Sequence, residues 1–144
     1  MTITSRQVAR EAIASLIRAR STLAQVVYEY MPGNFAGASP VVTITGSGSE
    51  RPRMTLRGVK TQFHLMVETF VLYADPDASP PWTEHDAENT LDALEAEVAQ
   101  IVENNASGER WSSLTYETTS VVSKVTIGGV AYLYEAIPLV VEVL

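Results

Sequence analysis

The chain has 144 residues, a net charge of −7 and no cysteine. This length fits one domain that buries its own core, and the missing thiols exclude cysteine nucleophiles, thiolate metal sites and disulfides. The first residues lack an apolar stretch behind a basic start, and every apolar run is shorter than the roughly 20 residues that cross a bilayer. We therefore expect one soluble domain over residues 1–144, with no signal peptide and no membrane span.

Charge is distributed unevenly along the chain. Residues 1–60 hold eight basic and three acidic side chains, a net of +5, whereas residues 61–144 hold two basic and fourteen acidic side chains, a net of −12. Such polarity bears on partners rather than on fold. A molecule that is basic at one end and acidic at the other is suited to bind its own copies head to tail, a contact that closes rings or grows filaments.

The N-terminal segment, residues 5–30, has apolar residues at helical spacing and arginines on the other side, which predicts an amphipathic helix. Thr4, followed three residues later by Gln7, fits a capping box at its start. Proline and glycine in residues 31–34 end the predicted helix. The apolar positions are Val8, Ala12, Ile13, Leu16, Leu23, Val27 and Tyr30.

Two strands follow the first helix. Residues 41–45 are β-branched and predict a strand. The Gly-, Ser-, Arg- and Pro-rich residues 46–60 predict a long loop, with residues 54–59 as an alternative extension of the next strand. Residues 61–74 alternate between apolar and polar and predict a long strand, and the prolines and aspartates of residues 75–81 indicate a turn.

A second helix is predicted from Thr83, a good N-cap, to the Asn104-Asn105 pair, with Gly108 beyond it. Acidic residues in its first turn complement the positive end of the helix dipole. One face is apolar and another is acidic. The apolar stripe is Ala87, Leu91, Leu94, Val98 and Ile101, and the acidic stripe is Glu84, Glu88, Asp92, Glu95 and Glu103.

The C-terminal segment predicts a β-hairpin of residues 114–127 and 130–143 around Gly128-Gly129, a turn in which both positions need positive φ. This register places Val125 opposite Tyr132 and Val121 opposite Ala136. The last strand is apolar on both faces, so we expect it to be central and covered. The order of elements predicts an α+β fold with an antiparallel β-sheet of about four strands and two helices packed on one face.

The sequence offers no catalytic constellation. His64 and His85 lie on different elements, and Asp75-x-Asp77 lacks the glycine and glutamate of a calcium loop, so these aspartates are better explained as turn residues. Residues 45–49 match neither a nucleophile elbow nor a phosphate loop, because no helix follows them. We therefore predict no enzyme activity, no cofactor and no bound metal.

The basic stretch of residues 51–60 is the best candidate for contact with nucleic acid. No aromatic residues lie between its basic residues, and the chain as a whole is acidic. The stretch therefore fits a protein–protein contact better than a nucleic-acid contact. The acidic stripe of the second helix is most simply a solvated face, and its other role is to meet a basic partner.

Across nearly the whole chain, the order of these elements resembles the tail terminators, also called tail-completion or neck terminator proteins, of long-tailed bacteriophages. The resemblance rests on the basic helix, the strand and polar loop, the long strand, the Pro-rich connector, the acidic helix, and the closing segment of residues 125–143. It implies a virion subunit that forms a ring, usually a hexamer, at the head-proximal end of the tail tube. The implied partners are other copies of the chain, the tail tube protein, and a neck or head-completion protein, with genomic DNA passing through without specific binding.

We expect the basic loop of one subunit to approach the acidic helix of its neighbour, because a head-to-tail contact closes a ring. The residues of this expected interface are Arg51, Arg53, Arg57, Lys60, Glu84, Glu88, Asp92 and Glu95. Three alternatives remain open. The first is another head–tail joining or tail tube protein. The second is an α+β domain with a small-ligand pocket between helix and sheet. The third is an enzyme, for which the sequence shows no set of catalytic residues.

Overall fold

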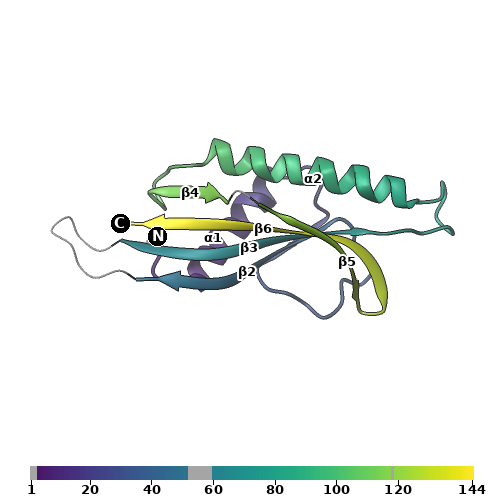
Figure 1. The fold of residues 1–144 in the computed structure, drawn as a ribbon, viewed down its shortest axis with the longest axis horizontal. Helices are drawn as coiled ribbons and strands as arrows, with labels where there is room; N and C mark the ends of the chain where they lie inside the picture. Colours follow the sequence, from purple (N-terminus) through teal and green to yellow (C-terminus); the bar gives the residue numbers. More distant parts are fainter. Residues whose placement is uncertain (1–2, 52–59, 118) are drawn as a thin grey trace.

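A computed structural model describes residues 3–51, 60–117 and 119–144. Over these residues the chain forms two helices and six strands in one sheet, which confirms the α+β class. The elements are α1 (Arg6–Arg20), β1 (Val26–Tyr28), β2 (Val41–Glu50), β3 (Thr61–Leu72), α2 (Glu84–Asn104), β4 (Ser113–Tyr116), β5 (Val121–Ile127) and β6 (Val130–Val143). Figure 1 shows α2 along one long side of the sheet and α1 behind the strands. Neither helix, within the part of the chain that the structure describes, is long and apolar enough to cross a membrane.

The strand order is β1-β2-β3-β6-β4, and β5 also pairs with β6. β1 and β2 are parallel, and the other pairs are antiparallel. The prediction of about four antiparallel strands is therefore wrong in number and in one pairing. The additional strands come from β1, which lies inside the predicted first helix, and from the division of the predicted strand 114–127 into β4 and β5.

α1 begins one residue later than predicted. The side chain of Ser5 accepts a hydrogen bond from the backbone N–H of Val8 at 3.2 Å, so Ser5 is the N-cap and the expected Thr4–Gln7 capping box is wrong. Serine is among the best N-cap residues because its hydroxyl satisfies one of the helix's unpaired N–H groups.

α1 also ends well before residue 30. Ser21 adopts extended backbone, and the carboxylate of Glu97 on α2 accepts hydrogen bonds from both Ser21 and Thr22. These contacts offer the chain an alternative to further helical bonds. Val26–Tyr28 then pairs with β2, so Val27, which continues the helical spacing, belongs to a strand, and Leu23 and Tyr30 lie in the connections on either side of it.

β2 continues to Glu50, so the predicted loop over residues 46–60 is wrong for residues 46–50. Gly46 lies opposite Leu65 and Gly48 lies opposite His64, and the extra residue between the two glycines forms a β-bulge. Pairing with β3 thus overrides a composition typical of loops. Residues 52–59, including the alternative extension over residues 54–59, lie outside the described part of the chain.

α2 matches its prediction. Thr83 is the N-cap, and it forms a capping box in which Thr83 and Asp86 each accept a hydrogen bond from the other's backbone N–H. The helix ends at Asn104, with Asn105 as its C-cap. The predicted apolar stripe is buried: Ala87, Leu91, Leu94, Val98 and Ile101.

The C-terminal hairpin also has its predicted register and turn. Val125 lies opposite Tyr132, and Val121 opposite Ala136. Gly128 and Gly129 have φ angles of 57° and 81°. As expected, β6 is central, with β3 on one side and β4 and β5 on the other.

Pro138 explains why the strand opposite β6 is interrupted between Tyr116 and Val121. In an antiparallel strand the N–H and C=O of one residue point to the same side. The carbonyl of Pro138 accepts a hydrogen bond from the N–H of Glu117 at 3.0 Å, so its missing N–H faces the same side. A strand there would lack one ladder bond, and the chain leaves the ladder at this point.

Two hydrophobic clusters lie on the two faces of the sheet, because they contain opposite sets of alternating strand residues. The larger cluster joins the buried residues of α1 and α2 to one set of alternating positions, such as Leu65 and Val67 on β3. The smaller cluster uses the other set and includes Phe70, against which Phe35 packs edge to face at 4.8 Å between ring centroids. Phe35 comes from the connection between β1 and β2, so this connection covers part of the sheet opposite the larger cluster.

Candidate functional site

The fold places its two charged helices toward opposite ends of the strand order. α1 packs on β1, β2 and β3, whereas α2 packs on β3, β6 and β4. Because β1 and β2 lie at one end of the strand order and β4 at the other, the helices define two flanks. The basic flank consists of Arg6, Arg10, Arg18 and Arg51, and the acidic flank consists of Glu84, Glu88, Asp92, Glu95 and Glu103. Arg20, at the end of α1, lines a pocket with Glu97 and Gln100 of α2 and so lies between the two flanks.

Arginines of the basic flank donate hydrogen bonds to uncharged acceptors. The contacts are Arg6 to the Ser49 hydroxyl at 2.7 Å, Arg10 to the Glu29 carbonyl at 3.1 Å, Arg18 to the Val27 carbonyl at 2.8 Å and Arg51 to the Thr4 carbonyl at 3.1 Å. Among the described residues, no arginine lies within salt-bridge distance of a carboxylate. Neutral acceptors orient a guanidinium group but do not neutralise its charge. Glu11 of α1 and Glu50 of β2 lie on the same elements, so the positive charge of this flank is that of its arginines less these two carboxylates.

The acidic flank is mostly solvent-exposed, with only Glu95 half-buried. One oxygen of Glu95 accepts a hydrogen bond from the Tyr116 hydroxyl at 3.0 Å. Beneath this flank, Glu135 of β6 is only 5% exposed and accepts a hydrogen bond from Ser120. Burial raises the pKa of Glu135, and the charges of Glu95 and Asp92 raise it further. The carboxylates of α2 therefore act on a buried carboxyl group of the sheet and disfavour its ionisation.

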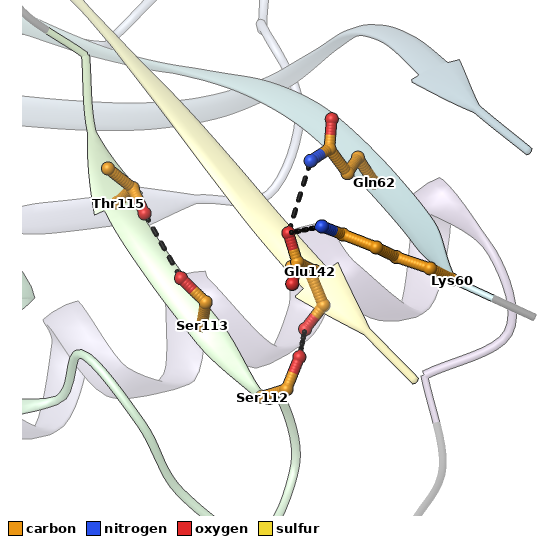
Figure 2. Close-up of polar contacts among 6 residues, drawn as sticks. All are labelled: Lys60, Gln62, Ser112, Ser113, Thr115 and Glu142. Carbon is orange, nitrogen blue, oxygen red and sulfur yellow. Dashed lines mark hydrogen bonds and ion pairs between the residues drawn. The ribbon is translucent and has the colours of Figure 1, made fainter. Parts of the chain in front are cut away.

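Lys60, a predicted interface residue, already has a partner within its own subunit. Its ammonium lies 3.0 Å from Glu142 Oε2, which also accepts a hydrogen bond from Gln62 at 3.1 Å, as Figure 2 shows. The hydrogen bonds from Gln62 and Lys60 lower the pKa of Glu142. The Lys60 side chain remains 48% exposed, so it is still accessible to a neighbour.

Within one subunit, Arg51 and Lys60, the predicted interface cations that the structure describes, lie apart from Glu84. Arg51 follows the end of β2 and Lys60 precedes β3, whereas Glu84 begins α2 after the opposite end of β3 (Figure 1). Arg51 also lies over the ring of Phe63, at 5.4 Å from its centroid. The other two predicted cations, Arg53 and Arg57, lie outside the described residues.

The residues considered for metal binding do not gather. His64 lies between Glu50 and Glu117, at 3.9 Å and 3.8 Å, and His85 is on α2. No group of three or more metal-ligating side chains occurs in residues 3–51, 60–117 and 119–144. The N–H of Asp77 donates to the Asp75 carboxylate at 3.1 Å, which confirms the turn role of Asp75-x-Asp77.

An open groove of about 680 Å³ runs between α2 and β4. Its lining includes Glu95 and Glu103 of the acidic flank together with Leu114 and Tyr116. This is the position that a small-ligand domain would use, between a helix and the sheet. Two carboxylates in its wall make the groove an extension of the acidic flank, suited to a cationic group.

Sequence reasoning missed two features of this surface. Glu97 looks like one more acidic residue of α2, and only the fold shows that it binds the connection between α1 and β1. The outer edge of β5 was hidden because residues 114–127 read as one strand, and only the structure shows that its Val121 and Val122 are exposed.

No model of a known protein family matches the sequence, and no curated protein matches it.

Proposed function

We propose that this chain is a structural subunit of a bacteriophage tail, of the tail-terminator type. It forms a homo-oligomeric ring, a hexamer by resemblance, at the head-proximal end of the tail tube, ends tube polymerisation and joins the tail to the neck or head. It acts through contacts with its own copies, the tube protein and a neck or head-completion protein, rather than through catalysis. The single observation that carries the proposal is the separation of arginines and carboxylates onto opposite flanks of one sheet.

Charge separation of this kind favours a head-to-tail contact. In a ring, the basic flank of each copy meets the acidic flank of the next, and the contact closes on itself. A two-fold contact through either flank would instead place like charges together, which is unfavourable at an interface. Each exposed pair contributes about 0.2–1 kcal/mol, so several pairs are needed, and their sum falls as salt screens them.

We further propose that α1 and α2 cover the same face of the sheet. The larger hydrophobic cluster supports this arrangement, because buried residues of both helices share it with one set of alternating strand positions. A subunit built in this way keeps its strand edges and much of its second face for neighbours. A ring subunit needs such surfaces on both sides and at both ends.

The first test is the mass of the purified protein by light scattering, across protein concentration and from 50 mM to 1 M salt. A discrete species of about six copies that dissociates as salt rises supports the proposal. Filaments of indefinite length would favour the tail tube alternative. A monomer under every condition would contradict a ring that closes by charge.

A matched pair of variants separates the flank from net charge. Glu88→Lys reverses a carboxylate of the acidic flank, and Asp77→Lys makes the same change of charge in the exposed turn before α2. We expect Glu88→Lys to raise the concentration for half-assembly about tenfold or more, and Asp77→Lys to change it little. Equal effects of the two variants would show that overall charge, rather than the flank, controls assembly.

A further inference from the structure

The outer edge of β5 is unpaired among the described residues, since β5 pairs only with β6. In a hairpin with a two-residue turn, the residues that flank the turn exchange both backbone hydrogen bonds, and bonded and non-bonded pairs alternate from there. Ile127 and Val130 flank this turn. Val122, Lys124 and Thr126 therefore direct their N–H and C=O groups away from β6, toward the open edge.

This edge lacks the features that protect exposed strands. β5 is seven residues long, pairs in regular register, and contains neither proline nor a bulge. Val121 and Val122 are 60% and 52% exposed. The one charged residue, Lys124, is drawn over the ring of Tyr73, 4.2 Å from its centroid. Soluble proteins usually block a long apolar edge with charges, prolines or bulges, so an open edge of this kind indicates a partner strand.

The opposite side of the sheet offers a second unpaired edge. β1 pairs with β2 only at residues 41–43, so within the described residues Ile44–Glu50 has no strand on its outer side. This part of β2 belongs to the basic flank, because the Arg6 guanidinium binds Ser49, and Arg51 follows directly. β5 instead follows β4 beside the acidic flank.

We infer that β5 of one copy pairs edge to edge with the outer edge of β2, Ile44–Glu50, in the next copy, so that the sheet continues from subunit to subunit. This inference rests on the proposed head-to-tail assembly and names its contact. The charges beside each edge favour β5–β2 pairing over β5–β5 pairing. A β5–β5 contact would bring two acidic flanks together, whereas a β5–β2 contact places the carboxylates of α2 beside the arginines of the neighbouring basic flank.

Val122→Pro tests the outward hydrogen bonds. Proline removes the N–H that faces the open edge and leaves the bonds to β6 intact, a position where strands tolerate proline. Val122→Thr is the control, since threonine keeps the N–H and favours strands. We expect both variants to keep the circular dichroism of the wild type, and Val122→Pro alone to raise the half-assembly concentration at least tenfold. Wild-type assembly of a folded Val122→Pro would overturn the inference.

Cysteine cross-linking tests the partner strand and does not depend on the proline variant. The chain has no cysteine, so introduced thiols react alone. Paired strands lie about 4.8 Å apart, within reach of a short bis-maleimide between Val122→Cys and Ser47→Cys. We expect a cross-linked dimer when the two proteins are mixed, and none from Val122→Cys alone.

The outcomes separate this inference from the proposed function. A cross-link from Val122→Cys alone would show β5–β5 pairing, and an assembled mixture without a cross-link would show another contact. Either result overturns the β5–β2 pairing while the ring itself stands. A wild-type protein that never assembles would overturn both.

Discussion

Replacing Glu97 with glutamine removes the carboxylate that joins α2 to the connection between α1 and β1. Its two oxygens accept hydrogen bonds from the Ser21 hydroxyl, from the Thr22 N–H and hydroxyl at 2.9 Å and 2.7 Å, and from the Leu23 N–H at 3.5 Å. Glutamine keeps one acceptor oxygen and turns an NH₂ group toward the partners of the other oxygen. On that side a backbone N–H loses its acceptor, a hydroxyl has to reverse to accept, and every remaining bond loses its charged partner.

The expected loss of stability is about 1–2 kcal/mol. A hydrogen bond to a charged group contributes about 1.5–3 kcal/mol, but Glu97 is half-exposed and solvent screening reduces each bond. For a domain of this size, 1 kcal/mol corresponds to roughly 3–4 °C in Tm, so the Tm should fall by about 3–8 °C. Glu103→Gln is the control on the same helix, because Glu103 is exposed and makes no hydrogen bond to a described residue.

The pH dependence gives a sharper test. Partial burial raises the pKa of Glu97, but the hydrogen bonds from Ser21, Thr22 and Leu23 outweigh it, so the pKa lies below its ordinary value of 4.5. A lowered folded pKa contributes stability above the unfolded pKa, and this contribution is lost as pH falls through the folded pKa. Urea unfolding should show the full difference between wild type and Glu97→Gln at pH 7 and a much smaller one near pH 3. An equal difference at both values would refute the reasoning.

Two further predictions concern the hairpin and the sheet. Gly128→Ala should lower the free energy of unfolding by about 1–3 kcal/mol, because its Cβ would lie 2.9 Å from the amide nitrogen of Asn34, and combining it with Asn34→Ala should give less than the sum of the single losses in urea unfolding. Tyr134→Phe should cost about 1–2 kcal/mol, because the hydroxyl donates to Glu68 at 2.7 Å. Burial and Glu68 raise the pKa of Tyr134, so ultraviolet titration of the variant should lack one late-ionising tyrosine.

Local sequence was sufficient where the interactions are local. The N-cap Thr83 and the apolar stripe of α2 belong to one helix, and the Gly128-Gly129 turn fixes the register of the strands beside it. In each case the residues that determine the structure are close neighbours in the chain. The α+β class followed from the same local signals.

Predictions from the sequence were wrong where a residue far away in the chain determines the local structure. Helical spacing continues past Arg20, but Glu97 binds the following turn and β2 pairs with Val26–Tyr28. Pro138 interrupts a strand that precedes it by some twenty residues. Propensity is a weak preference that tertiary contacts override.

The sequence by itself determined the α+β class, the second helix, the hairpin register and the excess of basic residues in the first part of the chain and acidic residues in the rest. Only the tertiary structure decided that the described arginines and the carboxylates of α2 lie on opposite flanks of one sheet. It also decided that, among the described residues, β5 and part of β2 keep unpaired edges. The physical reason is that charge along a chain is additive, whereas a flank or an edge exists only once distant strands have paired.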